Sequence, residues 1–63
     1  MDEPLLTVVE VAELLKVRRQ RVWSMSRRGE LPTIRLGTRE VRYRPEGIGK
    51  WIARRTTSRP RGT

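Results

Sequence analysis

Residues 7–29 read TVVEVAELLKVRRQRVWSMSRRG, and this stretch decides the fold. Thr7 and Glu10 stand at the spacing of a capping box, in which each side chain accepts a hydrogen bond from the backbone N–H of the other residue. The apolar residues that follow recur at the spacing of one helical face: Val8, Val11, Ala12 and Leu15. The sequence therefore predicts a helix over residues 7–15 that ends near Lys16.

A second helix is predicted from about residue 18 to residue 28. Val22 and Met25 form its apolar side, and Gly29 suits the left-handed residue that commonly follows a helix. Polar side chains lie on the opposite side of the helical wheel: Gln20, Ser24 and Arg27. Two short helices, joined by a brief turn at Val17 and with a basic outer face on the second, predict a helix-turn-helix motif.

Beyond the second helix, apolar and polar residues alternate as they do in strands. The alternating segments are TIRL (33–36) and VRYR (41–44). The loop between them is GTRE (37–40), which contains a Gly, as hairpin loops often do. We expect a basic β-hairpin with Arg39 at its tip, and with Arg35 and Arg42 on one face, where the two could bracket a phosphate. A hairpin that follows a helix-turn-helix is a wing, and the term is used below for residues 33–44.

Pro45 suits the first turn of a third helix. Apolar residues recur after it at helical spacing: Ile48, Trp51 and Ile52. Gly47 and Gly49 each cost about 1 kcal/mol relative to Ala in a helix interior. This helix is therefore expected to depend on docking and to be the weakest element.

The predicted fold class is mainly α with a β-hairpin, arranged as one winged helix-turn-helix domain over residues 5–53. Residues 1–4 are expected to be a flexible N-terminus. Residues 54–63, RRTTSRPRGT, contain four Arg and no large apolar residue, so they are expected to form a disordered basic tail.

The charge of the chain is large and unevenly distributed. The 63 residues include 15 Lys or Arg and 7 Asp or Glu, a net charge of +8. Residues 1–16 carry −3 and residues 17–63 carry +11, which favours a polyanionic partner. Thirteen of the basic residues are Arg, whose planar fork suits phosphates and guanine edges, so nucleic acid is the expected partner.

Several functions are excluded by missing residue types. The chain has no His and no Cys, so we expect no zinc site, thiol nucleophile or imidazole base, hence no enzyme, catalytic residue, metal, cofactor or small-molecule ligand. No apolar stretch approaches the roughly 20 residues that span a bilayer. The acidic N-terminus is unlike a signal peptide. A cytoplasmic protein of a bacterial cell, without membrane partners, is expected.

Three segments together resemble the excisionase family, also called recombination directionality factors, which is related to the DNA-binding domains of MerR-type regulators. They are RRGELP (27–32), IRLGTR (34–39) and RYRPEGIGKWI (42–52). The resemblance covers about residues 5–53. It implies that the second helix enters the major groove of double-stranded DNA, that the wing reaches the adjacent minor groove, and that binding is to repeated sites. The sequence departs from the family pattern at Lys16, where Gly is usual, and at Arg18, where a capping Ser or Thr is usual.

The candidate contacts follow from this placement. The start of the second helix is expected to meet base edges or phosphates, since Arg pairs with guanine and Gln with adenine. Trp23 is expected to pack under the wing or, as the alternative, to contact the sugar-phosphate backbone. Arg39 is expected in a narrow minor groove. The full set is Arg18, Arg19, Gln20, Arg21, Trp23, Ser24, Arg27, Arg35, Thr38, Arg39 and Arg42.

Three functions remain open from sequence. The first is an excisionase that binds repeated sites cooperatively, self-associates on DNA, bends it and directs a phage integrase toward excision. The second is a small MerR-like transcriptional regulator, which would usually carry a further ligand or dimer domain. The third is an RNA-binding protein, which would be expected to present aromatic platforms on a sheet, and the aromatic residues are not arranged that way.

Overall fold

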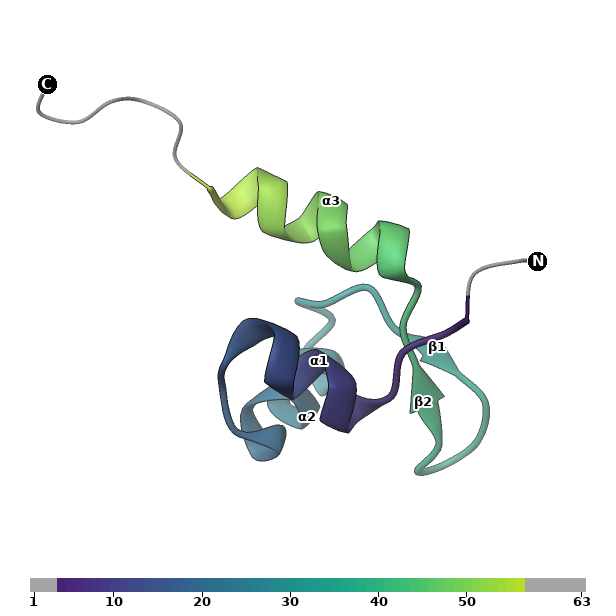
Figure 1. Ribbon diagram of the computed structural model, residues 1–63. Coiled ribbons are helices and arrows are strands. Elements are labelled where there is room, and N and C mark those ends of the chain that lie inside the picture. Colours follow the sequence, from purple (N-terminus) through teal and green to yellow (C-terminus); the bar gives the residue numbers. More distant parts are fainter. Residues whose placement is uncertain (1–3, 57–63) are drawn as a thin grey trace, which may run out of the picture.

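The computed structural model describes residues 4–56, and the expectations for residues 1–3 and 57–63 lie outside this range. Its elements are α1 (Val8–Leu15), α2 (Arg19–Arg27), β1 (Ile34–Arg35), β2 (Val41–Arg42) and α3 (Pro45–Arg55). Figure 1 shows α1 and α2 as a pair, with the hairpin projecting beside them and α3 on the side opposite to the hairpin tip. The three helices and the antiparallel hairpin confirm the predicted winged helix-turn-helix fold.

The capping box of α1 is formed as predicted. The N–H of Glu10 donates to Oγ1 of Thr7 (3.2 Å), and the N–H of Thr7 donates to Oε1 of Glu10 (2.9 Å). The segment just before the helix is anchored by Leu6, whose backbone exchanges hydrogen bonds of 2.7 and 2.9 Å with Tyr43. This bridge, which the sequence did not predict, ties the start of α1 to the end of the hairpin.

The two helices of the motif end with the same hydrogen-bond pattern, in which the chain reverses through one left-handed residue. After α1, Lys16 has φ 60°, and the next N–H donates to the Ala12 carbonyl (3.0 Å). After α2, Gly29 has φ 75° as predicted, and the next N–H donates to the Met25 carbonyl (2.9 Å). Because Lys16 has a Cβ, its left-handed conformation costs roughly 1–2 kcal/mol.

The hairpin is shorter than predicted, and its register differs by one residue. Ile34 pairs with Arg42, and Arg35 pairs with Val41. The predicted loop had four residues, whereas backbone hydrogen bonds to the carbonyl of Glu40 leave three. A shift of one residue moves a side chain to the other face of a strand. The expectation that Arg35 and Arg42 share one face was therefore wrong.

α3 begins at Pro45 as predicted but continues to Arg55. Arg54 and Arg55, assigned to the tail from sequence, are therefore helical, and ordered structure extends beyond residue 53. The indole N–H of Trp51 donates to the Glu30 carbonyl (2.7 Å), and the guanidinium of Arg55 lies 4.6 Å from the centre of the Trp51 ring. The bond to Glu30 joins α3 to the segment after α2, whereas the contact between Arg55 and Trp51 lies within α3.

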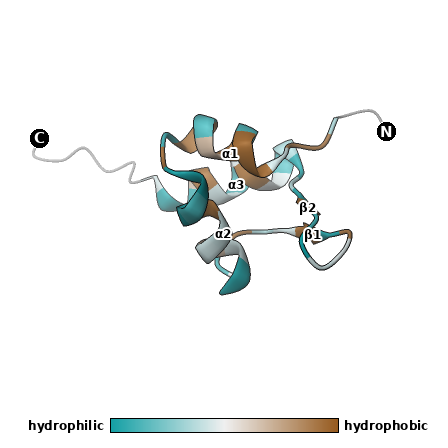
Figure 2. Ribbon diagram, turned by 90° about the horizontal axis from the view of Figure 1, so that it is seen from below, coloured by the Kyte–Doolittle hydropathy of each residue, from teal (hydrophilic) through white to brown (hydrophobic). Residues whose placement is uncertain are grey.

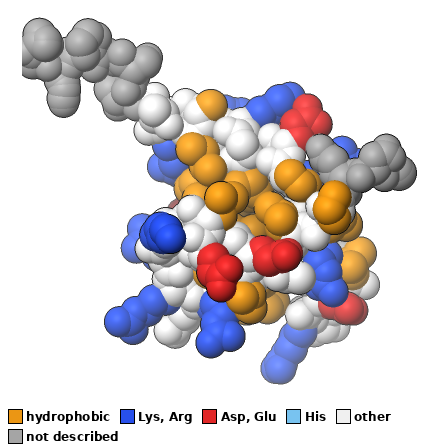
Figure 3. Space-filling view, viewed as in Figure 1, with side chains coloured by type: hydrophobic (Ala, Val, Ile, Leu, Met, Phe, Trp, Pro, Cys, Tyr) orange, Lys and Arg blue, Asp and Glu red, His pale blue; other side chains and the backbone are white. Residues whose placement is uncertain are grey.

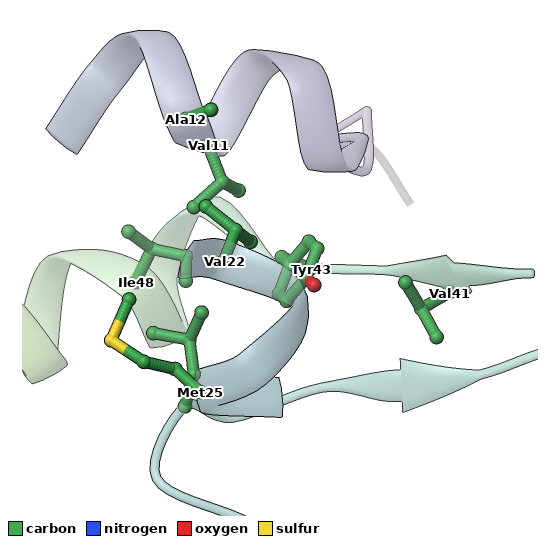
Figure 4. Close-up of a cluster of buried hydrophobic side chains, with 8 residues drawn as sticks. Val11, Ala12, Val22, Met25, Val41, Tyr43 and Ile48 are labelled. Atoms are coloured by element: carbon green, nitrogen blue, oxygen red, sulfur yellow. The ribbon is translucent and has the colours of Figure 1, made fainter. Parts of the chain in front are cut away.

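The core lies where α1, α2, α3 and the hairpin meet (Figure 4). Figure 2 shows the contrast between the largely hydrophobic α1 and the more hydrophilic α2. Ile48 of α3 is fully buried, so the third helix is docked through the predicted residue. The buried hydrophobic side chains are Val11, Ala12, Val22, Met25, Leu31, Val41, Tyr43 and Ile48.

Candidate nucleic-acid interface

The first turn of α2 carries basic and amide side chains at exposed positions. Arg19, Gln20 and Arg21 are all exposed, and the turn contains no acidic residue. Arg18 precedes it, and its side chain makes no capping hydrogen bond. A helix N-terminus has unpaired backbone N–H groups and the positive end of the helix dipole. Additional guanidinium groups are repelled there until an anion binds, so this end of α2 is suited to a phosphate.

The remaining candidates on α2 lie as the helical wheel predicted. Ser24 and Arg27 are exposed on the same side as Gln20, while Val22 and Met25 are buried. One exposed face of α2 therefore presents polar and basic side chains along its length.

Lys16 belongs to the same surface, although sequence analysis did not include it among the contacts. Two hollows flank the turn between α1 and α2, and Lys16, Val17 and Arg18 line both of them. Arg19 completes one hollow, and Gln20 is part of the other. The sequence held one signal for a role of this residue, since Lys16 stands where the family usually has Gly. A left-handed Lys costs stability, which favours a compensating role for its side chain.

A groove separates α2 from the wing. Its lining residues are Trp23 and Arg27 from α2 and Thr38 and Arg39 from the wing loop. Trp23 is half-buried and packs against the core, as expected for a residue beside the wing. Four residues that were predicted separately are thus brought together around one hollow.

Arg35 and Arg42 are not brought together. Nη2 of Arg35 donates to the carbonyl of Ser26 at 3.4 Å, so this side chain turns toward α2. Nη1 of Arg42 donates to the Val41 carbonyl (2.8 Å), and Nη2 lies 3.8 Å from the Glu40 carboxylate. They lie on opposite faces of the hairpin, so the two-sided phosphate contact expected from sequence is not possible in this arrangement.

Among residues 4–56, the Arg side chains at the start of α2 and at the wing tip form no ion pair, although Glu13 lines the same hollow as Lys16 and Arg18. The ion pairs among residues 4–56, at 3.3–3.8 Å, are Arg28–Glu30, Arg42–Glu40 and Lys50–Glu46. Within the same residues, no carboxylate pairs with Arg18, Arg19, Arg21, Arg27 or Arg39. Figure 3 shows the molecule from the α1 side. Acidic side chains lie over α1 in this view, and Lys and Arg side chains project around the lower edge of the molecule.

A buried hydrogen bond fixes the wing relative to α2. The hydroxyl groups of Ser26 and Tyr43 lie 2.6 Å apart, and the two residues are 3% and 0% exposed. The sequence did not predict this bond. The rule that buried polar groups find partners predicts that such a bond exists, but it does not identify the partner.

A family model described as a helix-turn-helix domain matches residues 5–56, which are 52 of the 63 residues. It is a DNA-binding domain that occurs in excisionase-like proteins. Comparison with curated proteins and with solved structures gave no match. In residues 4–56, no helix is both long enough and apolar enough to cross a membrane.

Proposed function

Because the chain belongs to this family of helix-turn-helix DNA-binding domains, we propose that it binds double-stranded DNA with α2 in the major groove and the wing along the adjacent minor groove. Arg19 and Gln20 then face base edges, where guanine and adenine present the acceptors and donors that these side chains recognise. Arg39 lies at the minor groove.

One observation carries this proposal. The first turn of α2 combines exposed Arg and Gln side chains with a positive helix end, and no carboxylate of residues 4–56 pairs with them. A merely solvated face would be expected to mix both signs of charge. Here the charges are of one sign and are concentrated at the end of the helix that helix-turn-helix proteins direct at bases.

The finer role that we propose is that of an excisionase in a bacterial cell. Copies bind repeated sites side by side, bend the DNA and direct an integrase toward excision. The division of charge supports contacts between copies, since exposed Glu10 and Glu13 on α1 complement the Arg side chains of a neighbour. Electrostatic contacts of this kind would give cooperativity on adjacent sites.

Titration of duplexes that carry one, two and three sites tests the excisionase role. We expect cooperative occupancy, and bending that increases with the number of sites. Gel mobility measures the occupancy, and energy transfer between the duplex ends measures the bending. Glu10→Gln and Glu13→Gln together should reduce cooperativity and leave single-site affinity unchanged or slightly higher. Independent occupancy without bending would contradict the excisionase role and favour a simple regulator.

A further inference from the structure

We propose that the groove between α2 and the wing holds the one sugar-phosphate strand that separates the major groove from the minor groove. This inference rests on the proposed function. It assigns Trp23, Arg27 and Thr38 to one segment of DNA backbone and gives them no part in reading bases.

The geometry requires a strand in this position. Neighbouring major and minor grooves of a duplex share one backbone strand as their common wall. When α2 occupies the major groove and the wing follows the minor groove, that strand must pass between them. Within residues 4–56, the space between α2 and the wing is the groove defined above, which is lined by Trp23, Arg27, Thr38 and Arg39.

The chemistry of the lining suits a phosphate and its sugar. Arg27 supplies an exposed guanidinium that pairs with no carboxylate of residues 4–56. The hydroxyl of Thr38 and the indole N–H of Trp23 also form no hydrogen bond within those residues. All three are donors toward the DNA backbone, whose phosphates and sugars together take half or more of protein–DNA hydrogen bonds.

Trp23 adds rigidity to the groove. Its ring is half-buried and packs against the hydrophobic core, so its orientation is set before DNA arrives. A fixed indole offers an apolar surface to a deoxyribose and an N–H to the adjacent phosphate. The buried Ser26–Tyr43 bond joins α2 to the residue after β2, so it holds the base of the hairpin against the helix that forms the other wall of the groove.

Methylphosphonate substitution tests this assignment. A short duplex is selected from a randomised pool by the full chain, and each phosphate is then replaced in turn by a neutral methylphosphonate. Affinity is measured for the wild type, Arg27→Gln, Trp23→Phe and Arg28→Gln. Arg28 is the matched control, since it also lies at the end of α2 but pairs with Glu30 at 3.3 Å.

We expect Arg27→Gln to lower affinity about tenfold, as for a lost hydrogen bond to a charged group. The salt slope should fall by about 0.9. At one position, a methylphosphonate should lower the affinity of the wild type and leave the affinity of Arg27→Gln unchanged. Trp23→Phe should lose part of the same sensitivity, whereas Arg28→Gln should keep it.

Two failures can be told apart. If the wild type selects no duplex, the proposed function itself is contradicted. If the wild type binds and Arg27→Gln responds to every methylphosphonate as the wild type does, only the backbone assignment is overturned. Circular dichroism confirms that each variant is folded.

Discussion

At the scale of single residues, Lys16 is the position where the proposed function sets stability against binding. It is the left-handed non-glycine residue among residues 4–56. Its backbone completes the end of α1, while its side chain lines both hollows beside the start of α2. Gly would suit the backbone better, but it would remove the ammonium group from the surface that is proposed to face DNA.

Replacing Lys16 should therefore change stability and DNA affinity in opposite directions. Lys16→Gly should raise the free energy of unfolding by roughly 1 kcal/mol, because glycine adopts the left-handed region without strain. The salt slope of DNA binding should fall by about 0.9 if one phosphate contact is lost. Thermal unfolding and fluorescence anisotropy measure the two effects.

Lys16→Asn separates the two contributions of this residue. Asn tolerates the left-handed region better than Lys and lacks the charge. Lys16→Asn should therefore lower DNA affinity as much as Lys16→Gly does, and it should stabilise the fold less. Unchanged DNA affinity in both variants would remove Lys16 from the interface.

At the scale of elements, the helices were more predictable than the hairpin. The capping box at Thr7 and the glycine at 29 are local signals, because the interactions that they encode join residues a few positions apart. The pairing of Arg35 with Val41 depends on whether the loop holds three or four residues, which the sequence GTRE does not decide.

The end of α3 was placed too early for a different reason. Local propensity favours a helix through Arg54 and Arg55, since Arg is a good helix former and a basic side chain suits a helix C-terminus, but the lack of large apolar residues after Ile52 was interpreted as the start of a tail. A tertiary contact also holds this helix: the bond from Trp51 to the Glu30 carbonyl joins residues 21 positions apart. The Ser26–Tyr43 and Leu6–Tyr43 bonds join residues 17 and 37 positions apart, and they were missed because no local signal identifies such partners. The candidate contacts stay a prediction from sequence, and the grouping of Trp23, Arg27, Thr38 and Arg39 around one groove was not part of it.

A pair of glycine substitutions tests the account of α3. Gly49 lies within the helix, and an added Cβ would meet no atom within 4 Å. Gly49→Ala should therefore raise the free energy of unfolding by roughly 0.5–1 kcal/mol. In a domain of this size, 1 kcal/mol corresponds to about 4–8 °C in Tm.

Gly29→Ala is the matched control. An added Cβ at position 29 would also meet nothing within 4 Å, but φ is +75°. This variant should lower the free energy of unfolding by roughly 1 kcal/mol or more. Destabilisation by Gly49→Ala would mean that α3 is not a regular helix around that residue.

At the scale of the whole molecule, charge is divided between two faces. The α1 side carries exposed Glu10 and Glu13. The start of α2 and the wing tip carry Arg side chains that form no ion pair among residues 4–56. The residues beyond 56 add Arg59 and Arg61 to the positive total. A field of this form attracts DNA and orients the chain before specific contacts form.

The affinity for duplex DNA should consequently fall steeply with salt. If about five to seven phosphates are neutralised, the slope of log K against log salt should be near −5 to −6. Removal of residues 57–63 should make the slope shallower while the helical circular dichroism spectrum stays unchanged. A flat response to salt would contradict an interface built on phosphates.

Base readout by α2 is the central claim, and selection from a random duplex pool tests it most directly. Wild type, Arg19→Ala, Gln20→Ala and Arg39→Ala are each used to select duplexes, and the preferred bases are compared. We predict that Arg19→Ala and Gln20→Ala each lose about 1–3 kcal/mol of binding free energy and relax the preference at specific base pairs. Arg39→Ala should weaken binding and keep those preferences, apart from A·T-rich steps at the minor groove. Base preferences that are unchanged in both Arg19→Ala and Gln20→Ala would contradict the placement of α2 in the major groove.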